Sequence, residues 1–352
     1  MAGNSFGITY KITTFGESHG TAVGVIIDGL PPGIEISDEE IQLEMNRRKP
    51  GQSSVTTPRS ESDRVSIVSG IFEGKTTGTP LTVILYNRDA RPSAYSDIKD
   101  LFRPGHADYT YHHKYGIRDY RGSGRASGRE TAGRVAAGAV AKKLLAAAGI
   151  EIKAFTLEAG GIRCKSVDLG IIEDNPMRAA DAVAAVEMQK LVEELAGKGN
   201  STGGIVECRI SGVPAGLGEP VFDKIDADLA KAVISLGGVK GIEFGAGFSA
   251  ASMLGSEHND GMDKNGFTSN NAGGMLGGIT TGADIIFRAA VKPTSSIEHP
   301  QKTVDKAGVE TEISTTGRHD PCLTPRMVPV VEAMAAVVLA DHMLRHRAQV
   351  SR

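Results

Sequence analysis

The chain has 352 residues, 40% of them hydrophobic and 23% charged, and its formal net charge is −3. This length accommodates one large domain or two ordinary ones, and the composition is that of a globular rather than a disordered protein. The slightly negative charge argues against a protein that holds nucleic acid by neutralising its phosphates.

Strands are predicted throughout the first quarter of the chain. Residues 5–15 and 22–28 are rich in Ile, Val, Thr and aromatic residues, as β-strands are. Further strands are expected at 65–72 and 80–87. The first two strands are joined by a glycine-bracketed turn, residues 16–20 (GESHG), which holds three side chains able to do chemistry.

Between these strands lie one predicted helix and two polar segments. Ser37 followed three residues later by Glu40 is the capping-box pattern of a helix, which we expect to continue to about Met45. Residues 51–64 are polar and are expected to form a mobile loop. Residues 88–117 show little regular signal, and a loop of that length inside a compact domain is usually functional.

The second half of the chain favours helices interrupted by glycine-rich segments. Apolar residues recur with helical spacing from Ala137 to Ala148, and Gly133 and Gly138 interrupt that pattern at a cost of about 1 kcal/mol each, so we expect another element to pack very close to them. Further helices are predicted at 178–197 and 329–345, strands at 203–211 and 284–291, and a polar loop or lid at 255–274.

These elements predict an α+β fold rather than regular βαβ alternation. No repeat of fixed period and no linker-like change of composition is evident, so residues 1–352 are expected to form a single domain.

The cellular setting is indicated by cysteines and by missing signals. Cys164, Cys208 and Cys322 lie far apart, which favours a reducing compartment without a disulfide framework or a cysteine-built metal site. The sequence shows neither a secretory signal pattern nor a run of eighteen apolar residues. We therefore expect a cytoplasmic protein that acts without membrane or nucleic acid.

Residues 118–134 (RDYRGSGRASGRETAGR) contain five arginines, interleaved with glycine and serine, immediately before a predicted helix. A guanidinium group matches phosphate and carboxylate oxygens, and a helix N-terminus adds unpaired N–H groups and positive potential. The stretch therefore predicts the wall of an anion-binding cage. The alternative is a solvated basic loop, which most charge runs turn out to be.

This stretch does not match a known nucleotide loop. Its glycines are spaced G-x-G-x-x-x-G, Ser127 stands where the third glycine of a dinucleotide fingerprint belongs, and no βαβ unit surrounds it. No Walker A sequence occurs either. Phosphate binding would therefore depend on arginine and backbone amides.

Three other segments are candidates for chemistry. His19 and His106 lie in loops bracketed by glycine or proline, and imidazole readily exchanges a proton near neutral pH, although a loop histidine is more often a surface residue. Residues 292–296 (KPTSS) supply a cation and hydroxyl groups, or simply end a strand. Residues 317–321 (GRHDP) place a carboxylate beside two basic groups, which alone could be a structural ion pair. No HExxH or compact His/Asp cluster predicts a metal site.

Taken together, five motifs resemble those of the chorismate synthase family, in the same order and across nearly the whole chain. They are GESHG at 16–20, RPGHAD at 103–108, GRASGRETAGRVAAGA at 124–139, KPTSS at 292–296 and GRHDPC at 317–322. The resemblance implies a lyase that converts 5-enolpyruvylshikimate 3-phosphate to chorismate and phosphate by trans-1,4-elimination. It further implies reduced FMN that is required but not consumed, a β-α-β sandwich in which antiparallel sheets enclose a helical layer, and a homotetramer.

The resemblance also assigns site residues. The catalytic group would be His19, which protonates the reduced flavin, His106, which assists the departing phosphate, and Asp320, which helps to deprotonate the flavin N5. The substrate would be bound by Arg48, Arg103, Ser127, Arg129 and Arg318. FMN would be bound by Arg125, Ala126, Ser127, Gly237, Gly238, Gly277, Lys292, Pro293, Thr294, Ser295, Ser296 and Arg318, and Arg48 would also contact NADP.

Three positions depart from the family pattern. Ser54 stands where an arginine is common, which puts one phosphate or NADP contact in doubt, and Ala126 and Gly128 replace a common serine and alanine near the expected FMN site. No added reductase domain is evident, so an external flavin reductase is expected, with NADPH as a candidate source of electrons. Two alternative interpretations are a flavin or sugar-phosphate binding protein without turnover, and a phosphotransferase. A phosphotransferase would need a nucleotide loop or a metal-binding carboxylate pair, and the sequence shows neither.

Overall fold

The structure is a computed structural model that describes residues 3–57, 61–89, 96–315 and 319–350. Within these ranges the chain contains two five-stranded antiparallel sheets. The first sheet has the order β1 (Ser5–Phe6), β2 (Lys11–Gly16), β3 (Ala22–Asp28), β7 (Leu81–Tyr86), β4 (Val65–Ser69). The second has the order β11 (Val239–Phe244), β16 (Ile285–Val291), β10 (Gly204–Ser211), β8 (Glu151–Ala159), β9 (Ile162–Arg163).

Two predicted strands are each broken by a glycine. The strand expected at 5–15 divides into β1 and β2 at Gly7, whose φ is +88°, and the strand expected at 65–72 divides at Gly70, whose φ is +85°. A Cβ atom at either position would collide with backbone atoms of a neighbouring segment, so only glycine fits there. The residues after Gly70 form β5 (Ile71–Phe72), which pairs with β6 (Lys75–Thr76).

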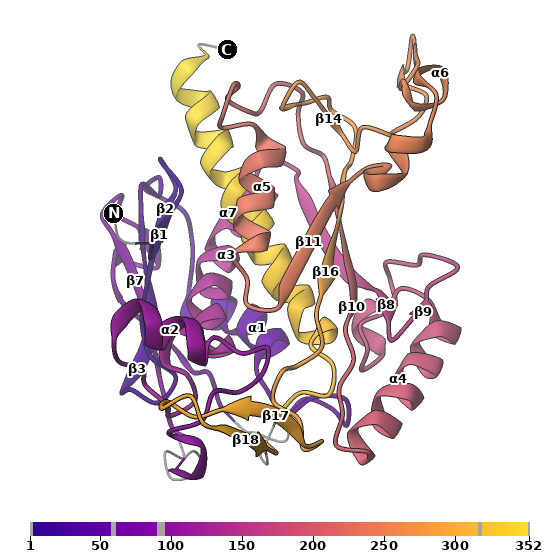
Figure 1. Ribbon diagram of the computed structural model, residues 1–352. Coiled ribbons are helices and arrows are strands. Elements are labelled where there is room, and N and C mark those ends of the chain that lie inside the picture. The colour runs from indigo at the N-terminus through magenta and orange to yellow at the C-terminus, as the bar shows by residue number, and fades with distance from the viewer. Residues whose placement is uncertain (1–2, 58–60, 90–95, 316–318, 351–352) are drawn as a thin grey trace.

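Three further two-stranded pairs lie outside the large sheets. They are β12 (Met262–Asp263) with β13 (Gly266–Phe267), β14 (Met275–Leu276) with β15 (Ile279–Thr280), and β17 (Gln301–Val304) with β18 (Glu310–Ile313). The polar segment 255–274, predicted as a loop or lid, contains the first of these pairs and the short helix α6 (Gly255–His258). Figure 1 shows α6 projecting away from the sheets at the upper right.

The predicted helices are present, with shifted ends. The Ser37 capping box is confirmed: Ser37 Oγ accepts from the Glu40 amide at 3.3 Å, and Glu40 Oε2 accepts from the Ser37 amide at 3.1 Å. The helix that it starts, α1 (Asp38–Arg48), continues past Met45. The other three predicted helices are α3 (Thr131–Ala146), α4 (Ala182–Gly197) and α7 (Thr324–Gln349).

The sequence reasoning missed several elements. The segment 88–117, expected to have little regular structure, contains α2 (Asp108–Tyr115), and neither α5 (Ile225–Ile234) nor the strand β8 was predicted. In α2 the aromatic and histidine residues give no clear apolar face, so helical periodicity could not reveal it. Short 3₁₀ turns are η2 (Gly124–Ala126), η3 (Gly128–Glu130), η4 (Ile172–Asp174) and η5 (Gly247–Ser252).

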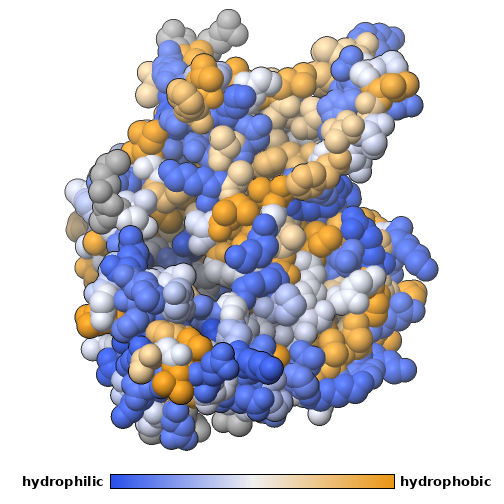
Figure 2. Space-filling view, viewed as in Figure 1, coloured by the Kyte–Doolittle hydropathy of each residue, from blue (hydrophilic) through white to orange (hydrophobic). Residues whose placement is uncertain are grey.

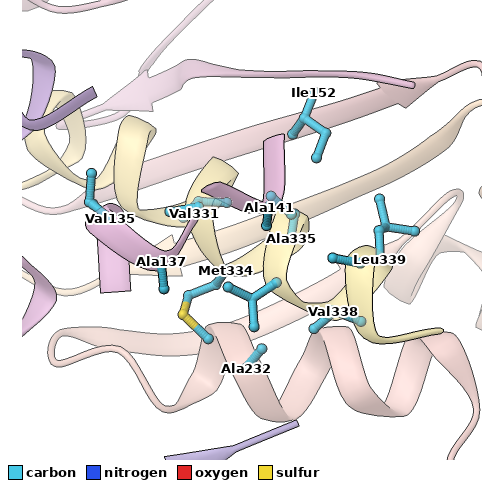
Figure 3. Packing of buried hydrophobic residues seen from close by; sticks show 14 of the residues in the cluster. Val135, Ala137, Ala141, Ile152, Ala232, Val331, Met334, Ala335, Val338 and Leu339 are labelled. Carbon is cyan, nitrogen blue, oxygen red and sulfur yellow. The ribbon is translucent and has the colours of Figure 1, made fainter. Parts of the chain in front are cut away.

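The helices α3 and α7 pack against each other between the two large sheets. α3 contacts β2, β3 and β7 of the first sheet and also β8 of the second, whereas α7 contacts β8 and β10 of the second. Figure 1 shows α7 running between the first sheet on the left and the second on the right, and Figure 3 shows Met334 and Val338 of α7 directed toward Ala232 of α5. Antiparallel sheets with segregated helices confirm the α+β class.

Close packing explains the two glycines in α3. A Cβ atom on Gly138 would overlap the Cα and Cβ atoms of Ala333 in α7, and one on Gly133 would lie 2.8 Å from the carbonyl oxygen of Gly24 in β3. The expectation that another element packs close to these glycines is confirmed. α7 is long and apolar enough to cross a membrane by length and composition, but 94% of its apolar window is buried inside the protein. It is therefore the core helix around which the other elements pack.

The segment 51–64, expected to be a mobile loop, contains both exposed and buried residues where the structure describes it. Val55, Thr56, Thr57, Glu61 and Asp63 all have relative exposures of 7% or less. The described part contains neither helix nor strand, which confirms a loop. Its buried polar groups are held beside one cavity: the Thr57 amide donates to Asp320, and the Asp63 carboxylate accepts from Arg48.

Candidate active site

A cavity of about 1080 Å³ lies where segments from distant parts of the chain meet. Figure 2 shows a recess near the centre of this face of the molecule. The wall combines the end of α1, the segment before α2, the turns η2 and η3, the α5–β11 turn, the end of β16 and the start of α7.

The described lining residues carry a large excess of positive charge. The cations are Arg48, Arg103, Arg125, Arg129, Arg134, Lys231, Lys240, Lys292 and Arg326, and the carboxylates are Glu61, Glu130 and Asp320. Nine cations against three carboxylates leave six positive charges in the wall, before histidine is counted. The N-terminal ends of α3 and α7 also lie at the wall and add positive potential. The cavity is therefore suited to ligands with several negative charges.

Two of these arginines are held by one buried carboxylate, Asp63. Arg48, the last residue of α1, donates from Nη1 to Asp63 Oδ2 at 2.8 Å, and Arg129 of η3 donates from Nη1 to Asp63 Oδ1. Burial alone would raise the pKa of Asp63, but Arg48 and Arg129 outweigh it and hold that pKa below its usual value. Asp63 thus stays ionised and fixes both guanidinium groups in place.

Several buried donors at the cavity have no hydrogen-bond partner among the residues that the structure describes. Arg129 donates from Nε to Asn87 Oδ1 at 2.9 Å, but its Nη2 is buried without such a partner. The same holds for Arg326 Nε and Thr294 Oγ1. Because an unsatisfied buried donor destabilises the fold by about 1–3 kcal/mol, these atoms favour an acceptor supplied by a ligand.

His106 and Arg103 form a second cluster in the wall, just before α2. Arg103 donates to both oxygens of Asp108, from Nε at 2.7 Å and from Nη2 at 3.0 Å. His106 lies between Asp108 and Ser123, with 3.2 Å from Nδ1 to Asp108 Oδ1 and 3.2 Å from Nε2 to Ser123 Oγ. Burial lowers the pKa of His106; the hydrogen bond to Asp108 opposes this, while Arg103 and Lys292 reinforce it.

Ser123 occupies a backbone conformation that glycine normally provides. Its φ is +73°, it is 8% exposed, and it lies between Gly122 and Gly124, which also have positive φ. Its hydroxyl accepts from Arg103 Nη2 at 2.5 Å and also contacts His106. A non-glycine residue held in this region destabilises the chain by about 1–3 kcal/mol and is typical of functional sites.

A third cluster comes from the segment before α7. Asp320 accepts from the Thr57 amide at 2.9 Å and from Arg326 Nη1 at 2.5 Å. Beside it, burial lowers the pKa of His319 to about 4, with Arg103 acting in the same direction and Asp320 opposing it. At neutral pH this imidazole is therefore uncharged.

The turn after β16 brings small polar groups to the same wall. Lys292 Nζ donates to the Gly105 carbonyl at 2.9 Å, and Ser295 Oγ donates to the same oxygen at 2.7 Å. This contact joins the KPTSS segment to the RPGHAD segment, although 187 residues separate Lys292 from Gly105.

The structure brings most of the predicted site residues to one cavity. Those that line it are Arg48, Arg103, His106, Arg125, Ala126, Ser127, Arg129, Gly237, Gly238, Lys292, Pro293, Thr294, Ser295, Ser296 and Asp320. Arg318 lies outside the described residues. Ser54, the departure from the family pattern, is exposed and donates to Glu193 Oε1 at 2.6 Å.

Two predicted residues are not part of the cavity wall. His19 packs behind it, with its ring against Gly122, and its Nδ1 lies 3.1 Å from Ser18 Oγ, which donates to the Gly122 carbonyl at 3.0 Å. Gly277 lies in the turn between β14 and β15. Within the described residues, no group of three His, Cys, Asp or Glu side chains could hold a metal ion.

Sequence reasoning missed Asp63, Ser123 and Arg326. Arg326 could have been noticed because a cation in the first turn of a helix is opposed by the helix dipole and so needs another reason to be there. Ser123 could have been noticed as the one side chain between two glycines in GSG. Asp63 gave no such signal, because only the folded chain brings it to Arg48 and Arg129.

Comparison with known proteins gives one consistent result. The family model described as chorismate synthase matches residues 10–344. A chorismate synthase of Syntrophobacter fumaroxidans is 56% identical over 352 residues, covering 100% of both chains. One of Methanosarcina mazei is 59% identical over 354 residues, covering 98% of this chain and 97% of the relative.

A solved structure agrees with the sequence comparisons. A crystal structure of chorismate synthase superimposes with a TM-score of 0.75 at 33% sequence identity, covering 95% of this chain and 91% of that one. The similarity therefore extends over sequence and fold, across nearly the whole chain.

Proposed function

The chain belongs to the chorismate synthase family, and from this premise we propose that its arginine-lined cavity binds reduced FMN beside 5-enolpyruvylshikimate 3-phosphate. As a member of this family it is a lyase that converts this substrate to chorismate and phosphate in the shikimate pathway. The family works with a flavin cofactor.

The observation that carries the proposal is the charge of the cavity wall. The substrate bears two carboxylates and a phosphate, and FMN bears another phosphate. Six excess positive charges, together with unpartnered donors such as Arg129 Nη2, fit this number of anionic groups. The volume of about 1080 Å³ lies at the upper end of the range for ligand sites, as two bound molecules require.

We assign the residues as follows. Substrate is bound by Arg48, Arg103, Ser127, Arg129 and Arg318. FMN is bound by Arg125, Ala126, Ser127, Gly237, Gly238, the segment 292–296 and Arg318, and Arg48 also contacts NADP. Gly277, which lies outside the cavity wall, is assigned to FMN from the family resemblance alone.

In the proposed mechanism, these arginines orient the substrate and exclude water, and His106 gives a proton to the departing phosphate. Asp320 in the cavity wall and His19 behind it would exchange protons with the flavin. Reduced flavin, when bound, would supply electron density for the loss of phosphate and would recover it with the loss of the ring hydrogen, so that no net oxidation results.

We extend the proposal to the assembly of the protein. The contacts of α3 with strands of both sheets and of α7 with the second sheet support a β-α-β sandwich of one domain, residues 1–352. We propose a cytoplasmic homotetramer supplied with reduced FMN by an external reductase, with NADPH as the electron source.

The test is chorismate formation, followed by absorbance under nitrogen. Dithionite-reduced FMN should support many turnovers and remain reduced at the end, whereas oxidised FMN should give no product. His106→Ala should lower turnover by about a hundredfold or more while FMN still binds. Stoichiometric oxidation of flavin would contradict the mechanism, and FMN binding without turnover would mean a binding protein. Reduction of FMN by NADPH with this protein alone would show that no external reductase is needed.

A further inference from the structure

Both ring nitrogens of His106 are already occupied by protein groups. Nδ1 lies 3.2 Å from Asp108 Oδ1, and Nε2 lies 3.2 Å from Ser123 Oγ. Arg103 Nη2 also lies 3.3 Å from Nδ1, but its two hydrogens are used in shorter contacts, to Asp108 Oδ1 at 3.0 Å and to Ser123 Oγ at 2.5 Å. An ionised carboxylate can only accept a hydrogen bond, so the proton of the neutral ring belongs on Nδ1, facing Asp108. Nε2 is then an acceptor, and the Ser123 hydroxyl donates to it.

Asp108 is built to remain ionised. It is 3% exposed, and Arg118 Nη1 lies 2.7 Å from its Oδ1 while Arg103 Nε donates to its Oδ2 at 2.7 Å. Burial would raise the pKa of Asp108, but the hydrogen bonds from His106 and Arg103 hold it far below its usual value. Asp108 does not line the cavity, so it acts on ligands only through its neighbours.

Ser123 stands between His106 and the cavity. It lines the cavity, and its Oγ accepts from Arg103 Nη2 at 2.5 Å. The same Oγ faces Nε2 of His106. Because Arg103 only donates, the hydroxyl hydrogen is free to point either to Nε2 or into the cavity. The unusual φ of +73° at this residue is the conformation that holds the hydroxyl in this place.

We propose that Asp108 is a positioning residue that fixes His106 in the Nδ1–H tautomer, so that Nε2 exchanges its proton with the cavity through Ser123. The inference rests on the proposed function of His106. When the ring is protonated, Nε2–H passes its proton to Ser123 Oγ while the hydroxyl proton moves to a phosphate oxygen. One proton crosses from His106 to phosphate, and Ser123 ends as a neutral hydroxyl.

Loss of the Asp108 charge has a defined direction. Among the described residues, the charged and titratable groups that act on His106 are Asp108 and Arg103 of its own segment, Lys292 after β16 and His319 before α7. Only Asp108 favours the imidazolium; Arg103 and Lys292 oppose it. Removing this carboxylate therefore lowers the pKa of His106.

The test compares Asp108→Asn with Asp119→Asn, which removes the same charge from a carboxylate that pairs with Arg121 at 2.9 Å. Nitrogen NMR of the ligand-free protein should show Nδ1–H at His106 in the wild type and in Asp119→Asn. In Asp108→Asn the tautomers should mix and the pKa of His106 should fall. Turnover should fall about a hundredfold, and the limb of the pH profile that requires protonated His106 should move to lower pH.

An unchanged tautomer and an unchanged His106 pKa in Asp108→Asn would overturn the proposal, as would Nε2–H in the wild type. Ser123→Ala should keep the Nδ1–H tautomer but lower turnover by about tenfold or more. Unchanged turnover in that variant would remove Ser123 from the proton path. The tautomer is measured without substrate, so failure of the proposed reaction would be seen separately.

Discussion

Arginines of equal charge have different roles in this protein according to what their guanidinium groups contact. Arg118 donates to the backbone carbonyls of Leu101 at 2.7 Å and Lys99 at 2.8 Å, and so holds the segment before α2. Arg121 is half exposed and, among the described residues, pairs with Asp119. Arg129, by contrast, is buried in the cavity wall, and its Nη2 has no hydrogen-bond partner within the described ranges. Position in the wall, and not charge alone, therefore places an arginine to bind a ligand.

This difference predicts the effect of a charge-conserving substitution. Arg129→Lys keeps the positive charge but loses the fork that reaches Asp63, Asn87 and a ligand together. We expect substrate affinity to fall about ten- to a hundredfold, since a hydrogen bond to a charged group contributes roughly 1.5–3 kcal/mol. Equilibrium binding of the substrate measures this loss of affinity. Arg121→Lys is the matched control and should bind the substrate as tightly as the wild type does. Equal affinity in the two variants would show that the fork is irrelevant.

The two histidines of the cavity predict proton uptake when an anion binds. The pKa of His319 is lowered to about 4 by burial and by Arg103, and that of His106 is lowered for similar reasons. An anionic ligand raises both pKa values, so at about pH 6 binding should take up protons. Calorimetric titration of substrate in two buffers with different ionisation enthalpies should give different heats.

Substitutions test whether the cavity histidines are the groups that take up the protons. His319→Gln should reduce the number of protons taken up, whereas His299→Gln, at an exposed position, should not change it. Heats that do not depend on the buffer would rule out this coupling between the anion and the histidines.

At the scale of elements, the cavity depends on how closely α3 and α7 approach. Gly138 of α3 faces Ala333 of α7 with no room for a Cβ atom, and both helices begin at the cavity wall. A wider spacing of the helices would move their N-termini, and with them Arg129 and Arg326. The small residue at this crossing therefore determines the geometry of the site as well as the packing of the core.

Gly138→Ala tests this contact. Alanine stabilises the interior of a helix by about 1 kcal/mol relative to glycine. At Gly138, however, its Cβ would overlap backbone atoms of Ala333, and overpacking of this kind destabilises the folded protein by about 1–3 kcal/mol. We expect a lower midpoint in chemical denaturation. Gly197 is the last residue of α4, and no atom lies within 4 Å of a Cβ added there. The Gly197→Ala variant should therefore be as stable as the wild type or more stable. A stabilised Gly138→Ala would mean that the helices separate easily.

The elements also show how far the sequence could predict the fold. The start of α1 was predictable because Ser37 and Glu40 satisfy each other locally, and the close packing at Gly138 was predictable because glycine is unfavourable inside a helix. α2 was not predictable, because its residues lack an apolar periodicity.

Site residues divide in the same way. Arg129 belongs to a motif that can be read from the sequence, whereas Asp63 is separated from it by 66 positions and acquires its role only through a tertiary contact. Ser123 takes its role from a backbone conformation, φ +73°, that local propensity disfavours.

At the scale of the whole molecule, one buried carboxylate connects four elements. Glu332 of α7 accepts from Arg47 of α1 at 2.5 Å, from Lys142 of α3 at 2.6 Å and from the backbone amide of Ala154 in β8 at 2.9 Å. It is 2% exposed. The network thus joins the helices that pack on the first sheet to a strand of the second, and it lies in the interior rather than at the cavity.

Glu332 therefore predicts how stability depends on pH. Burial would raise its pKa, but Lys142 and Arg47 lower it from 4.5 to about 2. Because the folded pKa is below the unfolded one, the unfolded chain takes up a proton first as pH falls. The stabilisation is complete above about pH 5 and is lost progressively toward about pH 2. Glu332→Gln should lower stability by about 3–5 kcal/mol at pH 7, because Arg47 and Lys142 lose their buried partner.

Thermal and chemical denaturation at pH 7 and pH 3 measure this effect. The difference in free energy of unfolding between the wild type and Glu332→Gln should be smaller at pH 3, because the ionised carboxylate then stabilises the folded wild type much less. Glu151→Gln removes an exposed carboxylate that pairs with Lys153 at 3.0 Å, and it should change stability little at either pH. A gap of the same size at both pH values would show that Glu332 stabilises the fold by packing alone, and that its charge does not hold the four elements together.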